Sequence, residues 1–219
     1  MSNKHPAYDG FYNRYGKRLL DLILSLLFLV IALPFYLIIA SAILIEDGPP
    51  VFYRPLRGGY KGKNFRIVKF RTMVKNADQI GGSTTALNDP RITRVGAILR
   101  KTKMDETANL LNIIRGTMSF IGPRPELLQY TSRYTGREKE IFEVRPGVTD
   151  YSSLKFINLD EIVGSENADE MYEKYVLAQK NALRVQYAET VSLKTDAAIF
   201  ARTVWMVVRK AAGFLFSSK

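Results

Sequence analysis

The strongest constraint on the fold is a run of 24 residues without a charged side chain, which occupies residues 22–45. Such a run is long enough to cross the roughly 30 Å hydrocarbon core of a bilayer as an α-helix. A cleaved signal peptide is a poor explanation, because the run exceeds an h-region and no small-x-small motif stands directly before Glu46. A soluble core helix this apolar on every face would need a larger domain around it. The default prediction is a transmembrane segment.

Pro34 and the flanking charges argue against a simple span. Proline lacks an N–H and its ring clashes with the preceding turn, so Pro34 is expected to kink the helix into halves of about 12 residues, about 18 Å each. Residues 1–18 contain four basic residues, and residues 48–75 contain eight basic residues and no acid. Because positive charge marks the cytoplasmic side, a helix that bends at Pro34 and returns to the same face satisfies both flanks. A kinked ordinary span is the alternative.

Composition narrows the chemistry that the chain can perform. The 219 residues include no Cys, which excludes disulfides, thiolate metal sites and a Cys nucleophile. The single His, His5, lies in a polar N-terminal stretch, so acid-base chemistry would fall to carboxylates, Lys, Tyr or a metal-bound water. The formal net charge of +11 indicates an anionic partner: nucleic acid, a phosphorylated substrate or anionic lipid.

Beyond the apolar run, the chain predicts a small β-hairpin and a mainly helical domain, which is an α+β fold. Residues 51–54 and 65–71 have the composition of short strands, and the glycine-rich segment 58–63 favours a hairpin turn between them. Residues 81–85 and 88–91 predict a polar loop over a site. This loop lacks the spacing of a Walker phosphate loop.

A helical pattern follows over residues 92–115, with a break expected near Thr102 or Lys103 and a C-cap at Gly116. Two rigid turns and two further helices are expected at residues 120–125, 145–149, 168–187 and 192–212. The last helix sets apolar residues such as Trp205 against Arg202 and Arg209. Such a helix usually lies in a domain core, and the alternative is an interfacial position on the bilayer.

Asp105 and Glu106 form the strongest candidate for a reactive site. They are adjacent carboxylates at the start of an apolar helical run, with four basic residues nearby, and a stiff Gly-Pro-Arg-Pro turn containing Arg124 follows. Cations keep a carboxylate ionised, so one of the pair could attack as a nucleophile while the other holds a hard metal ion. The alternative is that both are first-turn residues favoured by the helix dipole.

These residues belong to a series of motifs that resembles the bacterial sugar transferases, the monotopic phosphoglycosyl transferases that start glycoconjugate assembly on a polyprenol phosphate. The resemblance runs from about Lys17 to Arg209, with the motifs in the family's order and spacing. The motifs are Lys17-Arg18 with Asp21, Gly48-Pro49-Pro50-Val51-Phe52, Lys69-Phe70-Arg71-Thr72-Met73, residues 88–96, Leu99-Arg100-Lys101-Thr102, Asp105-Glu106, residues 112–125, and Arg145-Pro146-Gly147-Val148-Thr149.

The resemblance implies that a UDP-sugar donates its phosphosugar to polyprenol (undecaprenyl) phosphate, with release of UMP. By position, Asp105 would be the nucleophile of a covalent phosphosugar intermediate, Glu106 would bind Mg²⁺, and Arg124 would contact a phosphate. Further basic residues are expected to bind the substrates: Arg100, Arg91, Lys69, Arg71 and Arg145.

The expected organisation is an N-terminal tail (1–16), a re-entrant membrane helix (17–47) and a cytoplasmic catalytic domain (48–219) with interfacial amphipathic helices. The protein would lie at the cytoplasmic face of the bacterial inner membrane, in contact with membrane lipids. A homodimer is a further expectation, and no nucleic acid is expected as a partner.

Three departures from the family pattern leave the sugar open. Asp105-Glu106 is followed by Thr-Ala-Asn where the family commonly has Leu-Pro-Gln, and Leu33 precedes Pro34 where a Ser is frequent. Thr149 is followed by Asp-Tyr-Ser in place of the usual glycine-containing stretch. This last region is expected to touch the sugar or the nucleotide.

Two other functions compete with the enzyme. One is a catalytically silent, membrane-anchored nucleotide-sugar binding module, which the intact Asp105, Glu106 and Arg124 argue against. The other is a membrane-tethered nucleic-acid binder, which has the charge but no helix-turn-helix, RNP or zinc-finger signature. The enzyme is the preferred interpretation.

Overall fold

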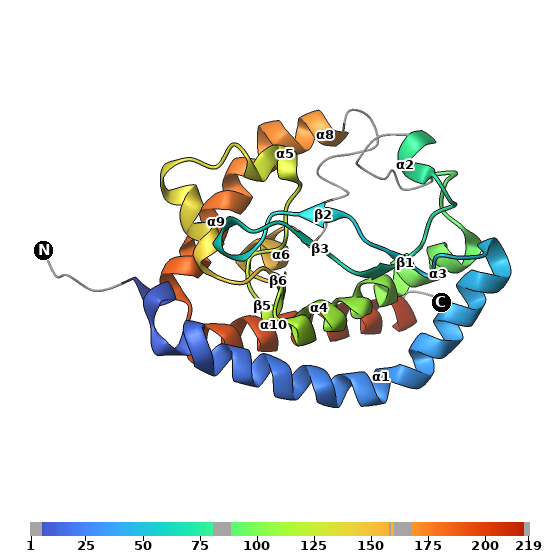
Figure 1. Ribbon diagram of the computed structural model, residues 1–219, viewed down its shortest axis with the longest axis horizontal. Helices are drawn as coiled ribbons and strands as arrows, with labels where there is room; N and C mark the ends of the chain where they lie inside the picture. Colours follow the sequence, from blue (N-terminus) through green and yellow to red (C-terminus); the bar gives the residue numbers. More distant parts are fainter. Residues whose placement is uncertain (1–5, 81–88, 158, 160–167, 217–219) are drawn as a thin grey trace, which may run out of the picture.

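A long helix, α1 (Lys17–Asp47), runs along one side of the molecule in the computed structural model (Figure 1). The structure describes residues 6–80, 89–157, 159 and 168–216. A 3-10 helix, η1 (Ala7–Asp9), and a π-helix, η2 (Tyr12–Gly16), lead into α1. α1 continues through Pro34 without interruption and is curved along its length in Figure 1. The re-entrant path expected at Pro34 stays a prediction.

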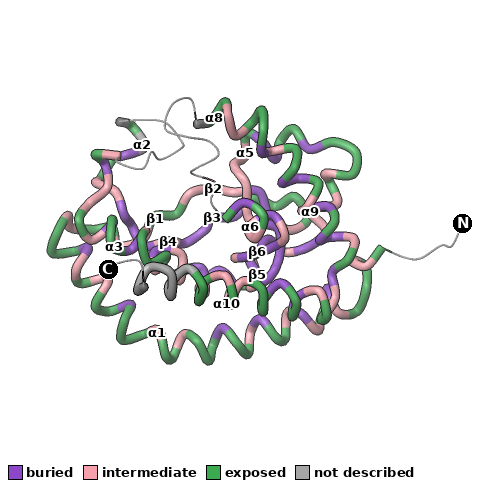
Figure 2. Tube along the Cα trace, turned by 180° about the vertical axis from the view of Figure 1, so that it is seen from behind, coloured by how far each residue is buried: buried purple, intermediate pink, exposed green. Residues whose placement is uncertain are grey.

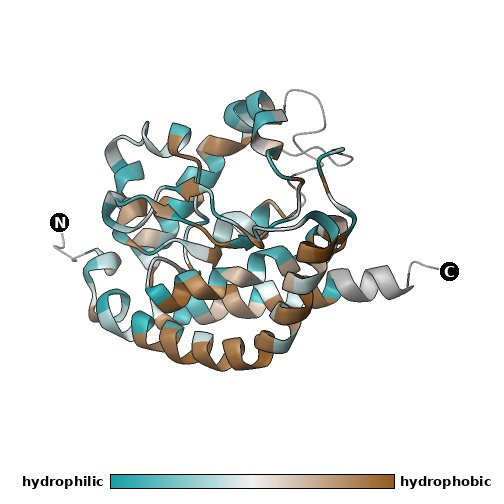
Figure 3. Cartoon of the chain, turned by 45° about the vertical axis from the view of Figure 1, so that its right-hand side comes forward, coloured by the Kyte–Doolittle hydropathy of each residue, from teal (hydrophilic) through white to brown (hydrophobic). Residues whose placement is uncertain are grey.

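α1 turns only a narrow stripe toward the rest of the chain. Its buried residues follow a helical repeat and so share one face: Lys17, Asp21, Ser25, Tyr36 and Ile43. Most of its other apolar side chains are exposed. In Figure 3 the ribbon of this helix forms a brown, hydrophobic band along the lower edge. Among the described residues, Tyr12–Asp47 is the segment that is long and apolar enough to cross a membrane.

The predicted hairpin is present, but it is divided into two short ladders. β1 (Phe52–Tyr53) pairs antiparallel with β4 (Lys69–Phe70), and β2 (Leu56–Arg57) pairs antiparallel with β3 (Phe65–Arg66). Pro55 lies between the two ladders and has no N–H to donate, which explains the gap in pairing. The polar loop predicted at 81–85 lies outside the described residues, as does Asn88.

The helical pattern predicted over residues 92–115 is also divided. α3 (Arg94–Thr102) ends at Lys103, whose φ of 57° is left-handed, and the 3-10 helix η4 (Met104–Asn109) and α4 (Leu110–Arg115) follow. The break therefore falls at one of the two residues predicted for it. Gly116 ends α4 with a φ of 80°, as a C-cap glycine does.

The two expected turns at 120–125 and 145–149 are joined by strands, which corrects the prediction of turns alone. β5 (Ser119–Ile121) and β6 (Gly147–Thr149) pair in parallel. The reason is a pair of glycines: a Cβ on Gly147 would lie 2.2 Å from the backbone nitrogen of Gly122. Only two glycines allow the backbones this approach.

Helices form most of the C-terminal part. α8 (Ala168–Met171), the π-helix η6 (Tyr172–Leu177) and α9 (Ala178–Thr190) follow one another along the predicted helix 168–187 and extend it by three residues. α10 (Leu193–Phe216) runs on the side of the molecule where α1 lies (Figure 1). The remaining short helices are η3 (Tyr60–Gly62), α2 (Ala77–Ile80), α5 (Leu128–Thr131), η5 (Gly136–Glu143) and α6 (Tyr151–Lys155).

α10 buries only part of its apolar surface. Ile199 is 1% exposed, but Trp205 is 67% exposed. Five further large apolar residues of the helix are also exposed: Leu193, Phe200, Val204, Val207 and Val208. The face that carries Trp205 therefore lies outside the domain core, and the interfacial position of this helix stays a prediction.

Two main apolar clusters hold the domain together. Figure 2 shows buried stretches in purple along the central strands. The first joins α1, the hairpin, α3 and η4: Tyr36, Ile43, Val68, Phe70, Leu99 and Ala108. The second joins the parallel strand pair, α9 and α10: Ile121, Val144, Tyr187, Ala188, Val191 and Ile199.

Candidate active site

Asp105 and Glu106 lie in η4, a tight helical segment that is packed against α1 and the hairpin. Ala108, three residues after Asp105, is fully buried in the first apolar cluster. The Tyr36 hydroxyl of α1 donates a hydrogen bond to the Thr107 carbonyl at 2.5 Å. These contacts fix η4 from two sides and so fix the direction of the two carboxylates.

Glu106 is held by two cations from distant parts of the chain. Lys69 Nζ donates to Glu106 Oε1 at 2.8 Å, and Arg124 Nη2 donates to the same oxygen. Burial raises the pKa of Glu106, but Arg124 and Lys69 outweigh burial, and the pKa lies well below its ordinary value. Glu106 is therefore ionised at any physiological pH.

Asp105 has a different environment from its neighbour. It is 9% exposed, and its buried Oδ1 has no hydrogen-bond partner among the described residues. Burial and the charge of Glu106 raise the pKa of Asp105, while Lys69, Lys103 and Arg100 partly offset that rise. Cations therefore surround Asp105, but no group of the described residues forms a hydrogen bond with its Oδ1.

Lys69 reaches Glu106 because the hairpin is fastened to α4. The side-chain amide of Asn112 accepts a hydrogen bond from the Val68 N–H at 2.7 Å and donates one to the Arg66 carbonyl at 2.8 Å. Asn112 therefore replaces a missing strand partner at this edge. The pairing of Lys69 with Tyr53 in the hairpin completes its placement.

Arg124 is placed by the parallel strand pair. Its loop follows β5 directly, and Arg124 Nη1 donates to the Val148 carbonyl of β6 at 3.3 Å. Glu126, two residues later, accepts hydrogen bonds from Arg184 Nη2 at 3.0 Å and from the Tyr172 hydroxyl at 2.5 Å. Burial raises the pKa of Glu126, but Arg184, Tyr172 and the Leu127 N–H together lower it by more. The buried ion pair of Glu126 with Arg184 anchors the loop to α9.

Among the other predicted substrate-binding residues, Arg100 lies nearest to the carboxylate pair. Arg100 Nε donates to Thr72 Oγ1 at 2.8 Å, and its charge acts on both Asp105 and Asp89. Arg91 is 9% exposed and is held by Asp89, with an ion pair of 2.6 Å, and by the Ala77 carbonyl at 3.0 Å.

The structure turns Arg71 and Arg145 toward other partners. Arg71 Nη2 donates to the Gly48 carbonyl at 2.5 Å and lies 3.1 Å from Asp47, at the C-terminal end of α1. Arg145 donates to the Gly116 carbonyl at 3.2 Å, and its guanidinium lies 4.8 Å from the centre of the Tyr60 ring. Their substrate-binding roles remain predictions, which the described contacts do not favour.

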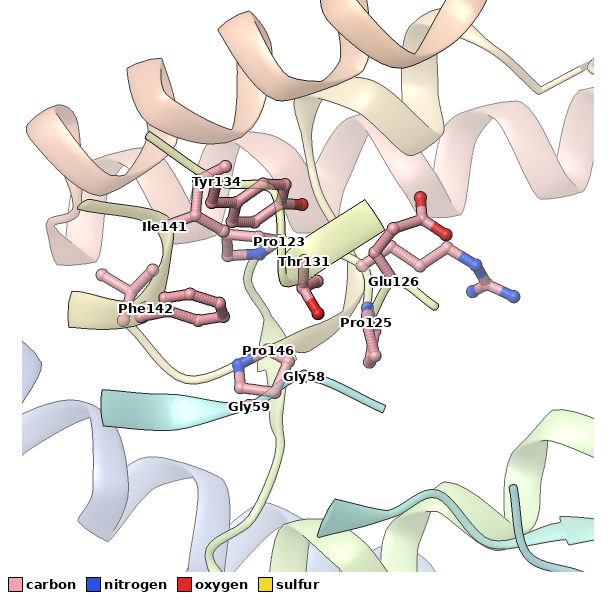
Figure 4. Close-up of a pocket in the computed structure, with 12 residues that line it drawn as sticks. Gly58, Gly59, Pro123, Pro125, Glu126, Thr131, Tyr134, Ile141, Phe142 and Pro146 are labelled. Atoms are coloured by element: carbon pink, nitrogen blue, oxygen red, sulfur yellow. The ribbon is translucent and has the colours of Figure 1, made fainter. Parts of the chain in front are cut away.

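A small cavity behind the Arg124 loop is too small for a substrate. It measures about 20 Å³, which is space for about one water molecule. Figure 4 shows that it is lined in part by Gly58 and Gly59 of the hairpin and by the rings of Tyr134, Phe142 and Pro146.

The sequence matches the model of a family described as bacterial sugar transferase over residues 12–210. The chain belongs to the bacterial sugar transferase family. Over 191 residues it is 36% identical to a UDP-glucose:undecaprenyl-phosphate glucose-1-phosphate transferase of Caulobacter vibrioides. The aligned region covers 86% of this chain and 68% of that protein. Over 204 residues it is 32% identical to the exopolysaccharide production protein ExoY of Sinorhizobium fredii, covering 86% of this chain and 84% of that protein.

A third relative carries a different sugar in its name. A putative undecaprenyl-phosphate N-acetylgalactosaminyl 1-phosphate transferase of Bacillus subtilis is 39% identical over 118 residues, covering 54% of this chain and 66% of that protein. The prediction that this sugar transferase is an enzyme of the phosphoglycosyl transferase class is confirmed.

The carboxylate pair of this sugar transferase suits a hard divalent cation. Asp105 Oδ1 is buried without a partner, and Glu106 Oε2 receives no hydrogen bond from the described residues, so each residue keeps a free oxygen. Within the same residues, no group of three or more His, Cys, Asp or Glu could hold a metal. Mg²⁺ commonly binds one or two carboxylates and completes its shell with phosphates and water, which this donor set fits.

Sequence reasoning missed the residues of the sugar transferase that hold the site in place. Glu126 directly follows the Gly-Pro-Arg-Pro turn, and its partner Arg184 lies 58 residues later on a charged helix. Asp21 was singled out only as part of a motif, and it accepts the Phe120 N–H at 3.1 Å. No local signal marks such partners, because the contact exists only after the fold brings two distant segments together.

Proposed function

We propose that the chain transfers a phosphosugar from a UDP-sugar to undecaprenyl phosphate through a covalent intermediate on Asp105. The observation that carries this proposal is the difference between the two neighbours: Glu106 is paired with Lys69 and Arg124 through Oε1, while the buried Oδ1 of Asp105 has no partner among the described residues. The names of the Caulobacter and Bacillus relatives support both the undecaprenyl phosphate acceptor and the sugar-1-phosphate as the transferred group.

The reaction that fits this pair has two displacements at one phosphorus atom. A carboxylate oxygen of Asp105 attacks the phosphorus that carries the sugar, the bond from that phosphorus to the bridging oxygen breaks, and UMP leaves with that oxygen. An oxygen of undecaprenyl phosphate then attacks the same phosphorus, and the bond to Asp105 breaks. The aspartate carboxylate is restored, so the cycle needs no further reactant.

The cations of the site would act on the phosphates. Arginine suits planar contact with phosphate oxygens, and Arg124 lies between the carboxylate pair and the β6 backbone. Lys69 and Arg100 add positive charge beside Asp105, which favours its ionised, nucleophilic form. Mg²⁺, bound by Glu106 and by a free oxygen of Asp105, would supply charge neutralisation for the diphosphate.

The attachment of α1 supports a re-entrant helix on the cytoplasmic face of the inner membrane. Near its start, Arg18 Nη2 donates to the Ile114 carbonyl at 2.7 Å, and Lys17 forms a buried ion pair with Asp196. Near its end, Glu46 accepts the Arg94 N–H at 2.8 Å. A helix whose two ends bind one globular domain cannot place those ends on opposite sides of a roughly 30 Å hydrocarbon core.

The exposed apolar face of α10 would lie on the same membrane surface. Trp205 is an interfacial residue by chemistry, and Arg202 and Arg209 on the same helix suit anionic lipid headgroups. With α1 inserted and α10 at the interface, the carboxylate pair would meet the phosphate head of a membrane-embedded polyprenol.

The test is UMP release with undecaprenyl phosphate and Mg²⁺ over a panel of UDP-sugars, followed by intact-mass spectrometry without the acceptor. We expect one phosphosugar adduct on the wild-type chain and none on Asp105→Asn. Glu170→Gln, an exposed acid on α8, is the matched control and should keep the adduct. An adduct that persists in Asp105→Asn removes Asp105 from the nucleophile role. UDP-sugar binding without UMP release would favour the catalytically silent binding module.

A further inference from the structure

Lys180, on α9, is a buried lysine that lies against two aromatic rings. It is 7% exposed, and its Nζ lies 4.9 Å from the centre of the Tyr172 ring and 5.8 Å from that of Phe156. Within the described residues, Lys180 donates no hydrogen bond and forms no ion pair. This side chain is therefore largely withdrawn from water without a protein acceptor.

The carboxylates closest to Lys180 are bound to other groups. Glu126 is held by Arg184 and Tyr172, and its other oxygen accepts the backbone N–H of Leu127. Asp150 accepts the Ser153 N–H at 2.7 Å in capping α6. Cation–π contact recovers only a fraction of the hydration that a buried ammonium loses. Lys180 thus has unused capacity for an anion.

Two arginines and two carboxylates act electrostatically on Lys180. Burial, together with Arg184 and Arg124, lowers the pKa of Lys180 to about 8, against the opposing effects of Glu126 and Asp150. Tyr172 faces Lys180 from η6 with its ring, not with a charge. The charges of Asp105 and Asp150 both act on Arg124, and the charge of Arg124 acts on Lys180. Arg124 therefore interacts electrostatically with both Lys180 and the carboxylate pair.

We infer that Lys180 is a second phosphate-binding cation, which binds an oxygen of the donor's diphosphate beside Arg124. The inference rests on the proposed function, in which that diphosphate is brought to Asp105. A phosphate oxygen would supply the acceptor that Lys180 lacks, and its negative charge would keep the ammonium protonated. The uridine and the sugar would lie elsewhere.

Equilibrium binding to the full chain in nanodiscs, in an Asp105→Asn background that cannot turn over, tests the inference. UDP and uridine are the probes, because they differ in the diphosphate alone. We expect Lys180→Met to weaken UDP binding by about tenfold or more and to leave uridine binding unchanged. Lys180→Arg, which keeps the charge, should retain most of the affinity for UDP.

The matched control is Lys174→Met, which removes an exposed lysine from the same helical run. Lys174 also lies over a ring, 5.1 Å from the centre of Tyr175, so it reproduces the ring contact without the burial. Its UDP affinity should equal that of the parent. Unchanged UDP binding in Lys180→Met overturns the inference, and so does an equal loss of UDP and uridine binding, which would indicate a structural role.

The pH dependence of UDP binding decides the matter if Lys180→Met does not fold. UDP affinity of the parent chain should fall as the pH rises above about 8, while Lys180→Arg should show a flatter profile. Identical profiles overturn the inference. A parent chain that binds no UDP contradicts the proposed function itself, whereas normal turnover with UDP binding insensitive to Lys180 contradicts only this inference.

Discussion

Two adjacent carboxylates acquire opposite properties because they face different partners. Glu106 meets Lys69 and Arg124, so its pKa is depressed below the ordinary value in spite of burial. Asp105 is buried without a hydrogen bond to Oδ1, so its pKa is raised. Environments that push two neighbouring pKa values apart are typical of sites in which one group reacts and the other supports it.

The raised pKa of Asp105 predicts where activity is lost in acid. The nucleophile must be ionised, so kcat/KM for UMP release should fall as the pH decreases through a value above the ordinary aspartate pKa of about 3.9. Lys69 lowers the pKa of Asp105, so Lys69→Met should raise that pKa and move the acid limb to higher pH. Lys63→Met, an exposed lysine of the same hairpin, is the control. If the acid limb of Lys69→Met stays in place or moves to lower pH, the result contradicts the assignment of that limb to Asp105.

The same asymmetry predicts opposite effects on stability. When folding raises the pKa of a carboxyl, ionisation of that carboxyl destabilises the folded protein as the pH rises through the raised pKa. Asp105→Asn removes this ionisation and should stabilise the protein at neutral pH by about 1 kcal/mol. The depressed pKa of Glu106 contributes stability that is present at neutral pH and is lost in acid. Glu106→Gln should therefore destabilise by about 1–3 kcal/mol and leave two cations without their carboxylate. Thermal melting in nanodiscs measures both, and shifts of one sign would refute this account.

At the scale of elements, local signals in the sequence predicted those features that depend on a few neighbouring residues. The hairpin, the helix break at Lys103 and the cap at Gly116 are of this kind, because turn and cap chemistry is decided within a few residues. The parallel pairing of β5 with β6 was missed. This pairing brings together Ser119 and Gly147, which are far apart in the sequence. A strand of three residues is also too short for its alternating pattern to predict it from the sequence.

The strand pair predicts a sensitive position outside the carboxylate pair. A Cβ at Gly122 would lie 2.3 Å from the Arg145 carbonyl oxygen, so Gly122→Ala should force β5 and β6 apart and displace Arg124. We expect a stability loss of about 1–3 kcal/mol and a fall in kcat/KM of about tenfold or more. Gly16→Ala is the control, since its Cβ would make an ordinary contact of 3.4 Å with Tyr12. Equal activity of both variants would show that the strand pair does not position Arg124.

At the scale of the whole molecule, the sequence predicted the residues that meet at the carboxylate pair better than the residues that hold them in place. Asp105, Glu106 and Arg124 stand in short recognisable motifs, and the structure brings them together. Arg71 and Arg145 have the same charge and similar motif context, yet the fold uses them to bind carbonyls at helix C-termini. Whether an arginine binds a substrate or a helix end depends on tertiary distances that no local pattern encodes.

The attachment of both ends of α1 to one domain leads to a prediction of topology. The chain has no native Cys, so Pro6→Cys, before α1, and Lys139→Cys, in η5, can be labelled separately in intact and lysed cells. Both positions are exposed. We expect an impermeant thiol reagent to reach neither residue in intact cells and both after lysis. Labelling of Pro6→Cys from the periplasmic side would overturn the re-entrant helix and leave a kinked single span.

Pro34→Leu tests how strongly this topology is fixed. The substitution restores one backbone hydrogen bond, a gain of about 1 kcal/mol, and favours a straighter helix. A true span would have to carry the four basic residues of 1–18 across the bilayer, at roughly 2.5–3.5 kcal/mol for each charge at the centre, and would break the Lys17–Asp196 ion pair. The cost of moving the four charges is several times larger than the gain from the hydrogen bond, so the labelling pattern should stay unchanged in Pro34→Leu.

UMP release by Pro34→Leu should still fall, because a straighter α1 would pull the Tyr36 hydroxyl away from the Thr107 carbonyl beside the carboxylate pair. A variant that labels from the periplasm would show that Pro34, and not the docking of both helix ends, determines the path of α1.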